Sequence, residues 1–219
     1  VYTLNLCEMD KSMHFNPFPY IRNKSDITKL VTNLIQNTNS PNIKNSSADP
    51  FWEKAEKMFL ESLFLYVWME CPKAYFNTEK GKVELLQQNW KSILFLLDEA
   101  QFLDNDTSPK LDERMNELAR KKPDHPAVKA YQRYRGGPDD TIRSVIMTVN
   151  ARMQPFDNEE LLEIFSSNDI PLDEFGTGID GDGKTKSNLF IIIPDDDDTF
   201  NFVPGMVYTM LFQELYRWM

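Results

Sequence analysis

Apolar residues recur at spacings of three and four along most of the chain, and this pattern predicts a succession of amphipathic helices. Between residues 25 and 35, for example, Ile27, Leu30, Val31 and Leu34 fall on one helical face. Clusters of Pro, Gly, Asp and Asn separate the periodic segments, as expected for caps and turns. The expected helices cover residues 25–35, 51–70, 81–103, 109–122, 126–135, 138–154 and 157–165.

The segment 51–70 differs from the other predicted helices because it is apolar on nearly every side after Met58. A helix of this kind is buried on all faces, so we expect it at the centre of the helical body. Asp49 precedes Pro50, and Asp is a favoured N-cap while Pro is favoured at the first helical position. Cys71 and Pro72 end the helix, and we expect the Cys71 thiol to be packed.

Both ends of the chain have a different pattern. Residues 1–6 alternate apolar and polar positions, which suits a short strand. Residues 189–193 form an unbroken apolar, mostly β-branched run, typical of a buried strand in a parallel sheet. Residues 202–219 are helix-like. The predicted fold class is therefore mainly α, a helical bundle inserted into an α/β domain that contributes only short flanking strands and a C-terminal helix.

Composition limits the classes of protein that this chain can represent. It has 219 residues, 41% of them hydrophobic, which is typical of a globular protein. Its net charge of −10 argues against a protein that coats nucleic acid with its whole surface. The two cysteines favour a reducing compartment over a disulfide framework. We find no signal peptide, and the longest apolar stretch, 58–69, is too short for a bilayer span of about 20 residues, so we expect no membrane contact.

Residues 178–185 satisfy the phosphate-loop pattern G-x-x-x-x-G-K-T. In a working phosphate loop a strand leads in and a helix leads out, so that backbone N–H groups converge on the phosphates. Here no strand pattern precedes the motif, and the predicted strand at 189–193 follows it. Asp180 and Asp182 would also repel phosphate, so we interpret the segment as an exposed loop.

Residues 93–99 resemble a second ATPase element, an apolar strand that ends in Asp98 and Glu99. Their apolar positions follow a helical stripe, and the order of the two motifs is the reverse of that in phosphate-loop proteins, so a core helix is favoured. We therefore predict no cofactor in this segment. The alternative is a self-contained nucleotide-binding enzyme that uses Lys184, Thr185, Asp98 and Glu99.

Charge is distributed unevenly along the chain. Residues 110–135 contain eight Lys or Arg and four acidic residues, a net charge of +4, whereas residues 157–200 have a net charge of −11. Both segments could be solvated faces. The more specific hypothesis is that the basic stretch, with Tyr131 and Tyr134 among its charges, docks an acidic protein or single-stranded DNA. The candidate docking residues are Arg120, Lys121, Lys122, Lys129, Arg133 and Arg135.

Four aspartates, 195–198, follow the predicted strand at its carboxyl end, the edge where open α/β sheets bind ligands. Adjacent carboxylates repel one another, so they need a cation, a basic partner or open water. A solvated turn and a functional edge both stay open. His14 and His125 have no Cys or carboxylate at ligand spacing, so no zinc site is supported, and no serine is paired with a histidine for nucleophilic catalysis.

Several stretches, in order, resemble one family: the TraG-like coupling proteins of conjugative type IV secretion, specifically their Gram-positive branch. The resemblance covers about residues 5–219. The stretches are Phe15 to Ile21, Asp49 to Ala55, Lys121 to Val128 with Tyr131 and Tyr134, Arg143-Ser144, Ala151 to Phe156, and Asp195-x-Asp197-Asp198-Thr199-Phe200-Asn201-Phe202.

The resemblance implies a hexameric RecA-like ATPase of the bacterial cytoplasm, anchored in the cell membrane through an N-terminal segment. It implies an all-α domain at residues 24–167 that recognises the relaxase and relaxosome accessory proteins. Residues 1–23 and 168–219 would then be pieces of the α/β motor, with Asp195, Asp197 and Asp198 at the motor's edge. The family's phosphate loop and Asp-Glu strand would lie outside residues 1–219, so ATP and magnesium are implied only for the parent protein, and this segment is expected to be inactive alone.

Overall fold

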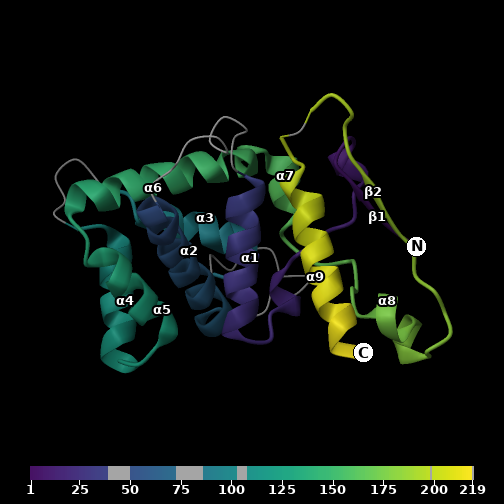
Figure 1. Cartoon of the computed structure of the whole chain (residues 1–219), viewed down its shortest axis with the longest axis horizontal. Helices are drawn as coiled ribbons and strands as arrows, with labels where there is room; N and C mark the ends of the chain where they lie inside the picture. The colour runs from purple at the N-terminus through teal and green to yellow at the C-terminus, as the bar shows by residue number, and fades with distance from the viewer. Residues whose placement is uncertain (39–49, 73–85, 103–107, 198, 219) are drawn as a thin grey trace, which may run out of the picture.

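A computed structural model describes residues 1–38, 50–72, 86–102, 108–197 and 199–218. Over these residues the fold is mainly helical, as predicted, with one small sheet (Figure 1). The helices are α1 (Lys24–Asn37), α2 (Pro50–Glu70), α3 (Trp90–Glu99), α4 (Lys110–Lys121), α5 (Pro126–Arg135), α6 (Asp139–Met153), α7 (Glu159–Ile164), α8 (Glu174–Thr177) and α9 (Phe202–Trp218). The strands are β1 (Tyr2–Asn5) and β2 (Leu189–Ile192).

The two strands pair in parallel, with Tyr2 opposite Leu189 and Asn5 opposite Ile192. Helices α1 to α8 lie between β1 and β2 in the chain, so the polypeptide leaves β1, forms the helical body and returns beside its starting point. The two predicted strands are confirmed, but the prediction that the second is buried is wrong. Phe190 is 56% exposed and Ile192 41% exposed, because one face of β2 has no covering element among the described residues.

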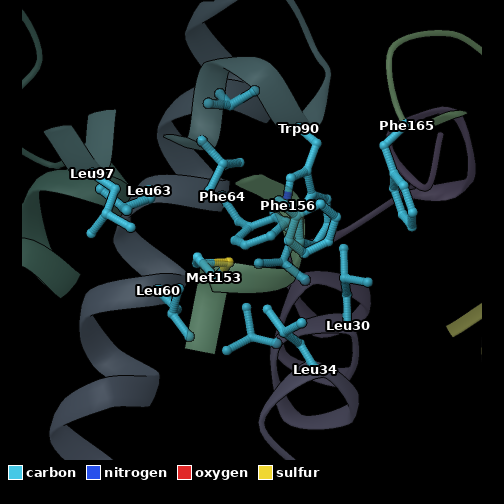
Figure 2. Packing of buried hydrophobic residues seen from close by; sticks show 14 of the residues in the cluster. Leu30, Leu34, Leu60, Leu63, Phe64, Trp90, Leu97, Met153, Phe156 and Phe165 are labelled. Carbon is cyan, nitrogen blue, oxygen red and sulfur yellow. The ribbon is translucent and has the colours of Figure 1, made fainter. Parts of the chain in front are cut away.

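Helix α2 occupies the centre of the helical body, as its all-round apolar surface predicts. It packs against α1, α3, α5 and α6. Phe59, Leu63 and Phe64 on this helix are completely buried. Figure 2 shows Phe64 of α2 directed toward Trp90 and Phe156, and Leu63 of α2 beside Leu97 of α3. Burial of side chains this large contributes about 1.5–3 kcal/mol each.

An aromatic cluster joins α3 to the segment after α6. The Trp90 ring stacks on Phe156, with ring centroids 4.6 Å apart, and Phe165 lies 5.2 Å from Trp90 (Figure 2). The same hydrophobic core extends to Leu4 of β1 and Val207 of α9. The helical body and both flanking segments therefore share one continuous core.

Arg152 on α6 ties three helices together. One guanidinium nitrogen donates to the carbonyl of Ile35 (2.9 Å) and to Oγ1 of Thr38 (2.7 Å) at the end of α1, and the other donates to Glu56 of α2 (2.8 Å). The Arg152 and Glu56 side chains are only 9% and 5% exposed. This ion pair is desolvated, and the guanidinium also satisfies a helix-terminal carbonyl.

A second ion-pair network joins α9 to the start of α1. Arg217 donates to Asp26 (2.6 Å), to Glu214 and to the carbonyl of Tyr20 (3.2 Å). Asp26 and Glu214 are both nearly inaccessible to solvent. Asp26 also completes a capping box with Asn23 at the N-terminus of α1, so the same carboxylate caps one helix and anchors another.

Two predicted helix boundaries are wrong. Residues 86–89 of the predicted helix 81–103 are not helical, and α3 begins at Trp90, since the Asn89 side chain caps it by accepting from Ser92 N (3.2 Å). The last helix of the body is capped by Asn158, whose side chain accepts from Leu161 N (3.0 Å), and not by Asp157. Predictions for Asp49, Asp198, the loop 39–48 and residues 81–85 and 103 lie outside the described residues.

His125 is the N-cap of α5. Its Nδ1 accepts a hydrogen bond from Ala127 N (3.2 Å), and its Nε2 lies 3.0 Å from Oε1 of Glu70. Burial lowers the pKa of His125, an effect that Glu70 opposes and that the charges of Lys122 and Lys24 reinforce. The folded protein therefore holds this imidazole neutral, because a protonated Nδ1 could not accept the capping bond.

We expect Arg152→Ala to lower the free energy of unfolding by about 3–5 kcal/mol, because it leaves the Glu56 carboxylate buried without its partner. Chemical denaturation measures the change. The paired replacement Arg152→Met with Glu56→Leu removes both charges and should recover most of the loss. A single variant as stable as the unaltered chain would show that the pair does not hold α2 and α6 together.

We expect stability to fall as pH decreases below about 6.5, since the unfolded chain takes up a proton at His125 that the folded chain resists. Denaturation at pH 7.5 and pH 5.5 tests this. His125→Asn keeps a capping acceptor and does not titrate, so it should lose less stability over the same interval. Equal losses in both proteins would mean that other groups cause the pH dependence.

Candidate functional site

The basic stretch forms α4 and α5, which lie at the end of the molecule opposite β1 and β2 (Figure 1). The acidic segment 157–200 includes α7, α8 and β2 at the other end. The uneven charge along the sequence therefore becomes a separation of charge along the long axis of the molecule.

Three of the candidate lysines form exposed ion pairs with nearby carboxylates. Lys121 bonds Glu117 (2.6 Å) within α4, Lys122 bonds Glu70 at the end of α2 (2.7 Å), and Lys129 bonds Asp124 (2.7 Å). The bond from Lys121 lowers the pKa of Glu117. Pairs of this kind contribute little to stability, so these lysines can exchange their partners for other anions.

Arg120 and Arg133 are exposed, and neither has a carboxylate within ion-pair distance among the residues that the structure describes. Arg135 differs from them. Its guanidinium contacts Asp112 (2.8 Å) and Asp139 (3.0 Å), which fix α5 against α4 and the start of α6. Arg135 thus has a structural role inside the fold.

Tyr131 and Tyr134 are buried, so they offer no exposed ring to a stacked base. The Tyr131 hydroxyl donates to Asp112 (2.8 Å), and the Tyr134 hydroxyl donates to the carbonyl of Ile142 (3.2 Å). Burial raises the pKa of both tyrosines. The interleaved tyrosines support the packing of α5 on α2 and α4.

The structure adds a groove that no sequence pattern indicated. It lies between α1, α2 and α5, has a volume of about 320 Å³ and includes Lys129 and Arg133 in its lining. Lys24, the first residue of α1, lines the same groove. Lys24 is about a hundred residues from the basic stretch in sequence, so only the fold brings these cations together.

Asp98 and Glu99 lie on helix α3, as predicted, and not on a strand. The Glu99 carboxylate receives two hydrogen bonds from Arg114 (2.5 and 2.6 Å). The Arg114 guanidinium also stacks on the rings of Tyr66 and Phe95, at 5.9 and 5.8 Å. Glu99 therefore holds α4 against α3, whereas Asp98 is exposed.

The segment 178–185 runs from α8 to β2, so a helical turn precedes it and a strand follows it. Asp182 accepts from the backbone N–H groups of Lys184 and Thr185 (both 2.9 Å) and from the Thr185 hydroxyl. A carboxylate of the chain itself thus uses the N–H groups that would bind phosphate in a phosphate loop. This segment and α3 lie on opposite sides of α9 in Figure 1, so the two ATPase-like motifs do not converge.

The acidic cluster lies between β2 and α9. Asp195, Asp196 and Asp197 are exposed, and Asp198 lies outside the described residues. The Asp197 carboxylate accepts from the backbone N–H (2.8 Å) and the hydroxyl (2.5 Å) of Thr199, and these bonds lower its pKa. The geometry is that of a capped turn at the carboxyl end of the strand.

The fold places a carboxylate beside each histidine, although neither partner is near in sequence. Nδ1 of His14 lies 2.5 Å from Oδ2 of Asp169, and Glu70 is the partner of His125. Among the described residues, no group of three or more His, Cys, Asp or Glu side chains is arranged to hold a metal ion. Cys71 is packed, as predicted, and burial raises the pKa of its thiol to about 11.

Many residues that carry the family resemblance are structural. Phe15, Phe18 and Phe156 are completely buried core residues, and Arg152 forms the buried ion pair with Glu56. The Asn16 side chain bridges two segments, since its amide nitrogen donates to the Gln88 carbonyl (2.8 Å) while its oxygen accepts from Phe18 N (3.1 Å). These residues therefore maintain the fold and do not form a surface for partners.

Helices long and apolar enough to cross a membrane are absent from the described part of the chain. A comparison with curated proteins finds no match. The comparison with protein families, in contrast, matches residues 1–217, nearly the whole chain, to the family described as type IV secretory system conjugative DNA transfer. Because this match covers nearly the whole chain, the chain belongs to this family of TraG-like conjugative coupling proteins.

Proposed function

We propose that this chain is the substrate-recognition part of a conjugative coupling ATPase. In this proposal the helical body holds relaxosome accessory proteins and the DNA-linked relaxase at the entrance of the translocation motor. Membership of the conjugative DNA transfer family indicates the process in which the chain takes part. The basic end formed by α4 and α5, far from the strands, is the surface that we propose binds these partners (Figure 1).

The pairing of β1 with β2 is the observation that carries this proposal. Parallel neighbours in one sheet need a crossover, and here the crossover consists of the entire helical body. This topology favours a helical domain, about residues 24–167, inserted between two strands of an α/β motor. The insertion then projects from the motor and is available to substrates.

Exposed apolar side chains at the flanks support the same arrangement. Phe190 and Ile192 of β2 face solvent, as do Tyr208, Phe212 and Tyr216 along one side of α9. Parallel sheets are normally covered on both faces. We infer that further parts of the motor cover these surfaces in the parent protein.

The remaining functions belong, in this proposal, to the parent protein. ATP and magnesium would act at motor elements outside residues 1–219, in a hexamer anchored in the cell membrane of a Gram-positive bacterium. Asp195, Asp197 and Asp198 would lie at the motor's edge. Residues 1–219 would contribute recognition of the substrate.

We expect the chain to bind purified relaxase or accessory proteins of its own conjugation system, measured by calorimetry. Reversing charge at Arg120, Lys121, Lys129 and Arg133 to Glu should weaken binding about tenfold or more, because these cations face solvent. Lys29→Glu with Lys54→Glu is the control, since both residues are exposed cations on α1 and α2 and neither belongs to α4 or α5. Unchanged binding after reversal would contradict the basic-surface hypothesis.

Direct binding of single-stranded DNA is the second candidate, favoured by exposed Arg120 and Arg133, which have no ion-pair partner among the described residues. It predicts an affinity for an oligonucleotide that falls steeply with added salt, because bound phosphates release counterions. The buried tyrosines and the net charge of −10 make protein docking the stronger proposal.

We expect calorimetric titration with Mg-ATP to give no saturable heat, because Asp182 already accepts from the N–H groups of the 178–185 segment. Lys184→Ala should leave this result unchanged. Saturable binding that Lys184→Ala abolishes would instead favour the self-contained nucleotide-binding enzyme.

A further inference from the structure

The groove between α1, α2 and α5 is built from stripes at helical spacing. Each helix contributes residues three or four positions apart, which share a face. The apolar part of its lining, called the floor below, includes the buried side chains of Ile27 of α1 and Leu65 of α2 together with Ala130 of α5. Its volume of about 320 Å³ is at the lower end of the range for small-ligand sites, roughly 300–1,000 Å³, so it fits one or two side chains of a partner.

Cations stand on two walls of the groove. Lys24 lies on the α1 side, and Lys129 and Arg133 lie on the α5 side. Lys24 and Arg133 are exposed, and no described carboxylate is within ion-pair distance of either. Lys129 is paired with Asp124, but the Asp124 side chain is 95% exposed, so another carboxylate can replace it at little cost.

We propose that this groove binds an acidic segment of a partner protein, which seats an apolar side chain on the floor and aligns carboxylates with Lys24 and Arg133. The proposal rests on the proposed function and specifies the surface that would perform it. Apolar burial supplies affinity, and the two unpaired cations set orientation and select against basic segments.

Two carboxylates in the lining favour a protein over a nucleic acid. Glu61 and Asp124 line the same groove. A nucleic acid strand carries a charge at every phosphate and would place some of them against these acids, whereas a peptide can vary its charge along its length. A peptide with separated acidic residues can leave an apolar or amide group opposite Glu61.

The experiment uses the 219-residue chain and purified relaxase and accessory proteins of the same conjugation system. Lys24→Glu with Arg133→Glu reverses both unpaired groove cations. Lys29→Glu with Lys54→Glu makes the same total charge change on α1 and α2 at exposed residues that do not line the groove. A photo-cross-linking amino acid at Ala130 maps contact with the groove, and the same probe at exposed Met147 on α6 is its control.

We expect the groove pair to weaken partner binding about tenfold or more and to abolish cross-linking at position 130, with thermal unfolding unchanged, while the control pair binds normally. Equal binding by the two double variants, or an equal loss of binding in both, would contradict the groove as the docking site and leave the proposed function standing. Absence of binding by the unaltered chain would overturn both. Cross-linking at position 130 to an oligonucleotide, with none to protein, would overturn the acidic protein segment as occupant.

Discussion

The parallel pairing of β1 with β2 is the constraint on which the rest of the structure depends. Tyr2 and Leu189 are far apart in the chain yet adjacent in the sheet, so the polypeptide between them must leave and return at one place. Parallel strands require a long crossover, and the helical body around α2 satisfies that requirement. Because the core is continuous from Leu4 through α2 to Val207, the body is fixed to its base and does not swing on a linker.

Several residues that carry the family resemblance are buried, whereas the cations proposed to dock partners lie on the surface, and Lys121 and Lys122 belong to both sets. Phe156 and Arg152 lie in stretches that resemble the conjugative coupling proteins; Phe156 stacks on Trp90 of α3, and Arg152 pairs with Glu56 of α2. Substitutions there change stability first. Lys24 and Arg133, in contrast, project from the surface without ion-pair partners in the described residues, so they can change between relatives at little structural cost.

Sequence periodicity predicts the helices well where one side faces the core, as in α1, or where every side does, as in α2. It fails where a local cap or a distant contact decides the outcome. The Asn89 side chain caps α3 by accepting from Ser92 N, so the helix begins at Trp90. The apolar pattern alone predicts a helix that passes through Asn89. The exposure of Phe190 depends on which elements cover β2, and the groove depends on Lys24 meeting α5. The basic stretch is recognisable from the sequence. Only the fold shows that Arg135 is held by Asp112 whereas Arg133 is exposed.

The Arg217 network has a mechanical consequence. Asp26 sits two residues after Lys24, on the helix that forms one wall of the groove, and its carboxylate is gripped by Arg217 of α9. A displacement of the first turn of α1 would separate Asp26 from Arg217. It would leave buried carboxylates without their full pairing to this shared cation, which is energetically costly. The network therefore fixes the first turn of α1, on one side of the groove, to the C-terminal end of α9.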